Sequence, residues 1–184
     1  QIDMGVIRGE LVKCSFPFPH DLEYEKRFWP FLILTKKRYV GKQVWPKESM
    51  LIRGFETRRT DSFPSQVEAL EEVFSLLMKS EIDAALNLSK DWVTRISKGE
   101  VEKDTLVISK TVNLKRKYVN EDNQAHLQAY KKYIETGRPF VSGMKISFIV
   151  TDARNSPMIV EPYIPEEECP EPDYNYYCLL YTSD

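Results

Sequence analysis

Three cations and a tyrosine stand together at the end of a short, largely apolar run. The run occupies residues 31–35, and Lys36, Lys37, Arg38 and Tyr39 follow it directly. Neighbouring like charges repel one another, so their grouping indicates an anionic ligand. Because Lys and Arg bind phosphate oxygens and Tyr can reach a sugar or a base edge, the segment predicts contact with a polyphosphate. A charged hairpin tip without a ligand is the alternative interpretation.

Two further groups of basic residues are spread along the chain. Arg58 and Arg59 form the first, and Lys110 with residues 115–117 and Tyr118 form the second. Phosphate contacts of this kind fix position and register on a duplex, and their affinity depends on salt. We therefore expect sequence-independent, salt-sensitive binding, although residues 115–117 also suit an exposed loop without a ligand.

Charge is unevenly distributed, although the net charge is only -2. Cations dominate residues 26–59, whereas residues 161–184 hold no Lys or Arg at all. Such a block suggests an anionic partner, and a solvated basic face is the alternative. The acidic run at residues 166–168 is predicted to be a solvated surface and not a metal site.

The sequence contains no familiar catalytic or metal-binding pattern. Nucleophile elbow, P-loop, H-E-x-x-H, glycine-rich dinucleotide loop and D-x-D spacing are all absent. The three cysteines form no C-x-x-C pair, and the two histidines, His20 and His126, are far apart, so we expect neither a disulfide framework nor zinc. These features favour a reducing, intracellular location.

No apolar stretch is long enough to span a bilayer. The first residue, Gln1, suggests a processed, truncated or excised chain.

The chain begins with a segment of predicted β-strands and continues with a segment in which helices are predicted. Residues 22–56 resemble an antiparallel meander, with strands at 22–28 and 31–35, a turn at 40–42, a third strand ending near Trp45, and a fourth at 50–55. After this point the apolar spacing becomes helical. The expected fold class is therefore α+β.

Residues typical of helix starts and ends predict where the helices of this second segment lie. A cap at Asp61 or Ser62 with Pro64 in the first turn predicts one helix, and a capping box from Ser80 to Asp83 predicts a second helix that ends at Gly99. The second helix is expected to bury Ile82, Leu86, Trp92, Val93 and Ile96. A third helix is expected at residues 123–135, and strands at 106–110, 145–151 and 158–164.

The chain resembles the end of the palm and the thumb of family B DNA polymerases. Five segments carry the resemblance, in the order and at about the spacing found in that family. They are residues 22–41 with Lys-Lys-Arg-Tyr, residues 52–61, the Leu-Val-Ile-Ser-Lys of residues 106–110, Tyr118 with the Gln-Ala-His of residues 124–126, and the Asp-Tyr-Asn-Tyr-Tyr of residues 173–177.

The resemblance implies an architecture and a set of contacts. Residues 1–60 would be the C-terminal palm segment, a small antiparallel β piece, and residues 61–184 a mainly helical thumb. The Lys-Lys-Arg-Tyr segment would follow the primer strand near its 3′ end, and the thumb residues would hold the duplex behind it. The implied DNA contacts are Lys36, Lys37, Arg38, Tyr39, Arg58, Arg59, Lys110, Tyr118 and His126.

The departures from the family pattern define the expected partners. The metal-binding aspartates, the fingers lysine and the exonuclease acids are absent, so the chain should not polymerise DNA alone and should hold no metal or cofactor itself. Mg²⁺ is expected in the catalytic site of a larger polymerase chain, as in split archaeal enzymes, or the chain is a fragment of a single enzyme. Primer-template DNA is the expected ligand, and a sliding clamp is a further candidate partner. A protein-interaction module with an incidental basic patch, or a general duplex-binding domain, remains the alternative.

Overall fold

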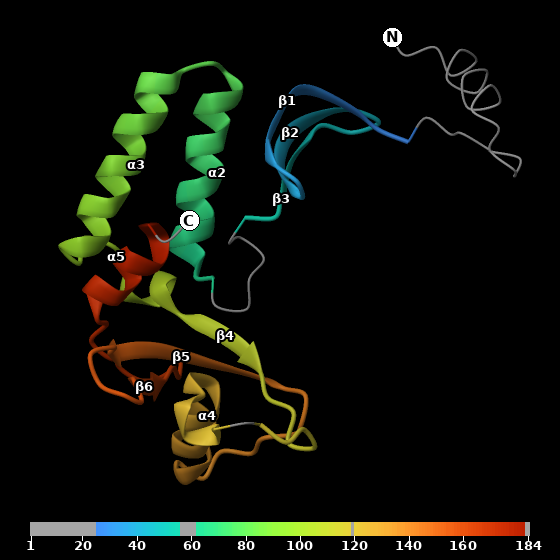
Figure 1. The fold of residues 1–184 in the computed structure, drawn as a ribbon. Helices are drawn as coiled ribbons and strands as arrows, with labels where there is room; N and C mark the ends of the chain where they lie inside the picture. The colour runs from blue at the N-terminus through green and yellow to red at the C-terminus, as the bar shows by residue number, and fades with distance from the viewer. Residues whose placement is uncertain (1–24, 56–61, 119, 183–184) are drawn as a thin grey trace, which may run out of the picture. The chain divides into compact units, whose positions relative to one another are not determined.

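The computed structural model describes residues 25–55, 62–118 and 120–182, and it has an α+β fold (Figure 1). The chain divides into two compact units, Gln1–Leu51 and Ile52–Asp184. Each of the two sheets in the described part has three antiparallel strands. The predicted boundary between residues 60 and 61 lies outside the described residues and stays a prediction.

The first sheet is a meander of β1 (Arg27–Thr35), β2 (Arg38–Trp45) and β3 (Ser49–Arg53), in that order. The fourth strand predicted at residues 50–55 is confirmed as β3, but the separate strand predicted at residues 22–28 does not occur among the described residues. Arg27 and Phe28 instead pair with β2 as part of β1, and the register slips between Phe28 and Phe31. The two strands predicted on either side of Pro30 are therefore one irregular strand.

The turn between β1 and β2 lies at Lys36 and Lys37, and the predicted turn at residues 40–42 is wrong. Thr35 pairs with Arg38, and Lys37 adopts a left-handed conformation with φ 71°. Gly41 belongs to β2, opposite Phe31, and a Cβ on it would overlap the Phe31 ring. Glycine is needed there because an aromatic ring covers the backbone.

Several apolar side chains of β1 are exposed within this chain. Trp29 is 74% and Ile33 67% accessible, and Phe31, Leu32 and Leu34 are exposed as well. Val40 on β2 is fully buried. Large apolar side chains are usually buried, so an exposed row of them marks a surface suited to another protein segment.

The second unit begins with an antiparallel helical hairpin of α2 (Pro64–Met78) and α3 (Ile82–Ser97). Pro64 occupies the first turn of α2 as predicted, and Phe63 at the N-cap makes no side-chain cap. The predicted capping box at Ser80 is wrong. Ser80 has φ 63° and closes α2, because its amide donates to Leu77 O and the next amide, of Glu81, donates to Leu76 O.

Helix α3 ends as predicted, but its buried face differs from the prediction. Gly99 has φ 69°, and its amide donates to Ile96 O. Trp92 and Ile96 are buried, whereas Ile82 and Leu86 are exposed. The first turns of α3 extend beyond the part of the helix that α5 covers (Figure 1), and there Ala85 is the buried residue.

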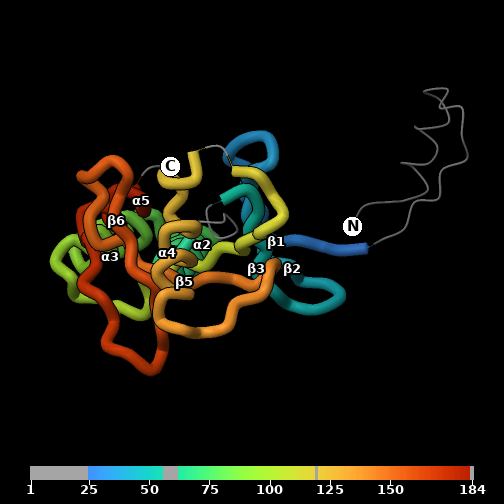
Figure 2. Tube along the Cα trace, turned by 90° about the horizontal axis from the view of Figure 1, so that it is seen from below, coloured from blue at the N-terminus to red at the C-terminus, as the bar shows by residue number. Residues whose placement is uncertain are grey.

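The second sheet consists of β4 (Ile108–Thr111), β5 (Lys145–Asp152) and β6 (Ile159–Pro162), with the 3₁₀ turns η2 (Lys103–Leu106) and η3 (Glu121–Asn123) nearby. Helix α4 (Ala125–Glu135) packs against β5 and β6, and Figure 2, seen from below, shows α4 in front of the sheet. Helix α5 (Tyr174–Thr182) packs against α3. One core joins all these elements, with Ile96, Leu106, Phe148, Val160 and Tyr177 at its centre.

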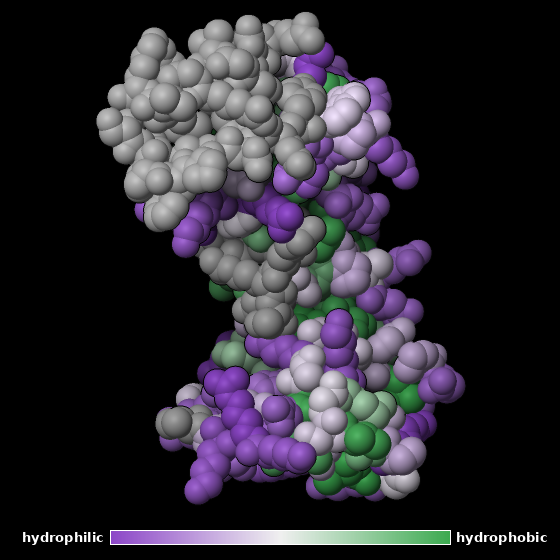
Figure 3. Space-filling view, turned by 90° about the vertical axis from the view of Figure 1, so that its right-hand side faces the viewer, coloured by the Kyte–Doolittle hydropathy of each residue, from purple (hydrophilic) through white to green (hydrophobic). Residues whose placement is uncertain are grey.

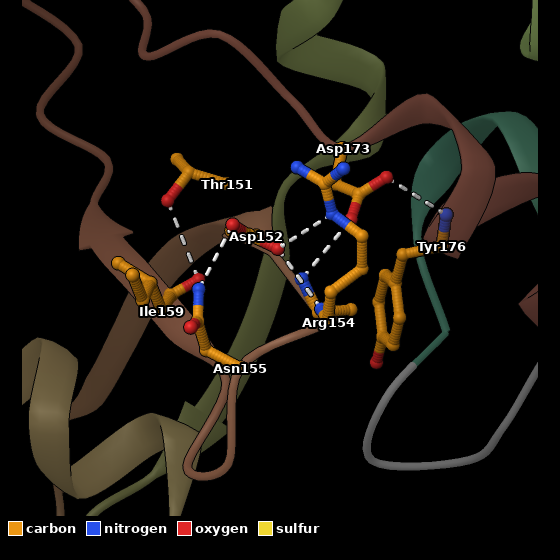
Figure 4. A network of polar contacts seen from close by, with 8 residues as sticks. Thr151, Asp152, Arg154, Asn155, Ile159, Asp173 and Tyr176 are labelled. Atoms are coloured by element: carbon orange, nitrogen blue, oxygen red, sulfur yellow. Dashed lines mark hydrogen bonds and ion pairs between the residues drawn. The ribbon is translucent and has the colours of Figure 1, made fainter.

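A polar network ties the end of β5 to the start of α5 (Figure 4). Asp173 accepts hydrogen bonds from the amides of Ala153 and Tyr176 at 3.0 and 3.2 Å. Asp152 accepts from the Arg154 backbone and side chain and from Asn155, and its pKa is lowered, chiefly by the Arg154 amide. Both carboxylates are thus occupied by local donors.

Candidate nucleic-acid interface

A basic pocket of about 520 Å³ lies between β4 and the N-terminus of α4. Its wall comes from the end of β4, from the loop that follows β4, and from the first residues of α4. None of the lining residues is acidic. They are Lys110, Thr111, Arg116, Lys117, Tyr118, Gln124 and His126.

Hydrogen bonds hold the loop that carries the cations. The Asn113 amide donates to the Tyr118 hydroxyl at 3.2 Å, and the Lys115 amide donates to Asn113 Oδ1 at 3.0 Å. The Leu114 amide donates to Ser142 Oγ at 3.0 Å, which joins this loop to the one before β5. The exposed cations at residues 115–117 therefore project from an internally bonded loop and not from a free chain.

Aromatic contacts join three of the residues that line the pocket. The Tyr118 and His126 rings meet edge-on with centroids 5.4 Å apart, and the Arg116 guanidinium lies 5.5 Å from the Tyr118 ring centroid. His126 is only 8% accessible. Burial, followed by the charges of Lys110 and Arg116, lowers the pKa of His126 below its ordinary value, so the ring is neutral at pH 7.

Figure 3 shows this end of the second unit, where hydrophilic side chains gather beside a hydrophobic patch. The loops that precede α4 and β5 both have exposed apolar side chains, at Leu114, Val141 and Met144. The Val112 amide donates to Met144 O and the Gly143 amide to Val112 O, at 3.0 and 2.8 Å, so backbone hydrogen bonds join the two loops.

The structure brings together three of the residues that the sequence assigns to DNA contact. Lys110, Tyr118 and His126 line the same pocket, although 16 positions separate the first from the last. Arg116, Lys117, Thr111 and Gln124 complete it. The basic run beside Tyr118 was the sequence signal for Arg116 and Lys117, but no pattern indicated that Thr111 would face the same space.

The remaining predicted residues lie elsewhere or outside the described part. Lys36 and Lys37 form the exposed turn between β1 and β2, and Arg38 and Tyr39 begin β2. The Tyr39 ring packs on Phe31 with centroids 5.4 Å apart, so at least one face of it is used in packing. Arg58 and Arg59 lie outside the described residues.

Acidic residues do not form a metal centre in the described ranges, where no group of three or more His, Cys, Asp or Glu side chains converges. Members of the acidic C-terminal segment pair with cations: Glu161 with Lys132 at 2.6 Å and Glu167 with Arg138 at 2.8 Å. Residues 166–168 are exposed, as predicted, and Glu167 additionally forms this surface ion pair. In the same ranges no helix combines the length and apolar character needed to cross a bilayer.

A family model described as DNA polymerase family B matches residues 5–180. The chain belongs to DNA polymerase family B. Within this family it is 33% identical to the DNA polymerase of Pyramimonas orientalis virus over 132 residues, which are 68% of this chain and 10% of that protein. It is 27% identical to the DNA polymerase delta catalytic subunit of Drosophila melanogaster over 161 residues, which are 85% of this chain and 15% of that protein.

A solved family B polymerase shares the fold. The chain aligns with the enzyme of the archaeon Pyrobaculum calidifontis at a TM-score of 0.59 and 22% identity, over 80% of this chain and 19% of that one. The chain thus spans about a tenth to a fifth of the family B polymerases that it matches. It corresponds to a region of a family B polymerase.

Proposed function

We propose that this chain is the duplex-binding palm-end and thumb region of a family B DNA polymerase, which holds primer-template DNA near the primer 3′ end. The observation that carries this proposal is the pocket at α4. Cations from β4 and from the following loop surround one space without an opposing carboxylate, together with Tyr118 and His126. Such a surface suits the phosphate backbone of a duplex, because phosphate contacts need cations and donors but no sequence readout.

The turn at Lys36 and Lys37 supplies a second contact in this proposal. Both side chains are exposed, and a tight two-residue turn holds their positions. A cation presented by a tight hairpin loses less freedom on binding than one on a mobile segment. The Lys-Lys-Arg-Tyr resemblance supports the assignment of this turn to the primer strand.

Catalysis is assigned to a larger chain, or to the rest of a single longer enzyme. Asp152 and Asp173 bind local donors and Glu161 and Glu167 pair with cations, so these carboxylates do not suit a two-metal site, and Mg²⁺ is assigned to the larger part. The exposed apolar side chains of β1, Trp29 and Ile33 above all, support a docking surface for that part. In this proposal the chain completes a nucleotidyltransferase site without supplying its metal ligands.

Binding of a fluorescent duplex with a recessed 3′ end tests the proposal. Lys117 lines the pocket, and Lys115, two positions away in the same exposed loop, does not. Fluorescence anisotropy across a salt series should show a smaller salt dependence for Lys117→Ala, by about 0.9 in the slope of log affinity against log salt. Lys115→Ala should change the slope much less. Failure of the unmodified chain to bind any duplex at low salt would exclude the proposal.

The exposed apolar row also suits the alternative of a protein-interaction module. Purification from cells of origin separates the two functions. A co-purifying polymerase chain with metal-binding aspartates supports the proposal, whereas a stable unrelated partner together with no duplex affinity supports the module.

A further inference from the structure

We propose that the pocket at α4 holds a single phosphodiester group of the bound nucleic acid, and that His126 takes up a proton when it does so. This inference rests on the proposed function and deepens it, because it makes the affinity for duplex DNA depend on pH. The affinity should be higher at lower pH, and this pH dependence should come from His126 alone.

The start of α4 offers amide donors to such a group. The amides of Leu127 and Gln128 both donate to Gln124 O, at 2.9 and 3.1 Å, and the two amides before them have no acceptor inside the helix. Gln124, at the N-cap, makes no side-chain cap. The positive end of the 11-residue helix therefore lies at a pocket that Gln124 and His126 line.

His126 is a second, independent feature that points to an anionic ligand. The residue is more than nine-tenths buried, lines the pocket, and makes no hydrogen bond to any described residue. Its ring nitrogens are not among the fully buried unpaired atoms of the described residues, so a ligand in the pocket can reach them. An imidazolium ring donates through both nitrogens, so a phosphate oxygen in the pocket would be an acceptor that the chain itself does not provide.

The charges around His126 explain why its ring is protonated only when the anion is bound. Burial, followed by the charges of Lys110 on β4 and Arg116 on the loop, disfavours the imidazolium ring, and Lys117 lines the same pocket. The nearby acids face other cations or solvent: on η3, Asp122 pairs with Lys131 at 3.1 Å and Glu121 is exposed, and on β6, Glu161 pairs with Lys132. Lys145 at the start of β5 pairs in register with Thr111 but lines a different pocket, together with Ser109 and Glu68.

A bound phosphodiester favours the protonated His126 ring, because its negative charge offsets the surrounding cations. The pKa of His126, lowered in the free chain, then rises in the complex, and binding takes up a proton between the two values. Affinity therefore increases as the pH falls through that window and is constant above and below it. Each unit of pKa rise corresponds to about tenfold in affinity.

Nuclear magnetic resonance of the imidazole nitrogens in the full chain tests the proposal directly. His20→Gln leaves His126 as the single histidine, so its titration can be followed with and without duplex DNA. We expect the His126 pKa to rise by about one unit or more with the duplex. Inorganic phosphate should cause little change at matched ionic strength; an equal rise would assign the pocket to free phosphate and overturn the nucleic-acid assignment.

Duplex affinity measured from about pH 8 to about pH 5.5 gives a second readout. The increase of about tenfold expected for His20→Gln should be absent in the same chain with His126→Gln, while the salt dependence stays similar. Unchanged pH dependence in the double variant would overturn this inference and leave duplex binding intact. Absence of duplex binding at every pH would remove the proposed function itself. If His126→Gln does not fold, the titration of the unmodified ring decides.

Discussion

The hydroxyl group of Tyr177 accepts a hydrogen bond from the backbone amide of Val150 at 2.9 Å. Both residues are fully buried, and the Tyr177 ring also meets Phe63 edge-on with centroids 5.2 Å apart. Asp173, four positions earlier, binds the start of α5 to the residue after β5. The Asp-Tyr-Asn-Tyr-Tyr segment therefore has a structural role here: it attaches the last helix to the second sheet and to α2.

Replacement of Tyr177 by Phe should destabilise the second unit by about 1–3 kcal/mol, because the Val150 amide would be left buried without an acceptor. Chemical denaturation followed by circular dichroism measures the change. Tyr130→Phe is the matched control, since the Tyr130 hydroxyl makes no hydrogen bond to a described residue and its ring packs on Phe140. Equal losses in the two variants would contradict the role assigned to the hydroxyl.

Gly99 should tolerate alanine much less well than Gly137. Both have positive φ, 69° and 79°, so both variants lose about 1 kcal/mol from the backbone conformation. A Cβ on Gly99 would also lie 2.8 Å from the Tyr174 ring, whereas a Cβ on Gly137 would meet nothing within 4 Å. We expect Gly99→Ala to cost about 1–3 kcal/mol more in unfolding free energy. The close contact is irrelevant to stability if thermal or chemical unfolding shows the same loss for both.

Local chemistry in the sequence was enough to place most helix ends. Pro64 and Gly99 act within a few residues of their own position, so the first turn of α2 and the end of α3 were predictable. Gly41 and Ser80 were misinterpreted because their roles depend on other segments. Gly41 makes room for a ring on the neighbouring strand, and Ser80 belongs to the end of one helix and not to the start of the next.

The candidate site was predictable as a set of residues but not as an arrangement. Its cations stand near Tyr118 in the sequence, and the family resemblance selected Lys110, Tyr118 and His126. Burial of His126 and the contact of Arg116 with the Tyr118 ring arise only when α4 packs against the sheet. The apolar run of β1 does not identify what covers it, because such a run indicates burial without naming the covering chain.

The stability of the free chain should fall as the pH falls below the ordinary histidine range, and His126 should account for part of the fall. Its folded-state pKa is lowered, mainly by burial, so the unfolded chain binds the proton more readily. The contribution is fully present above the unfolded value of about 6.5 and is lost as the pH falls from there through the folded value. Denaturation across this range should show a smaller decrease for His126→Gln than for the parent chain. A larger decrease in the variant would contradict the assigned shift.

Lys37→Gly should separate DNA contact from hairpin stability. Lys37 has φ 71°, a conformation that glycine adopts freely, so removal of the side chain should leave the unfolding free energy within about 1 kcal/mol of the parent value. Loss of the cation should nevertheless lower the salt slope of duplex binding by about 0.9. Lys90→Ala, an exposed charge on α3, is the control for a change in net charge alone. If both variants weaken duplex binding to the same extent, the turn makes no specific phosphate contact and only the overall charge of the chain matters.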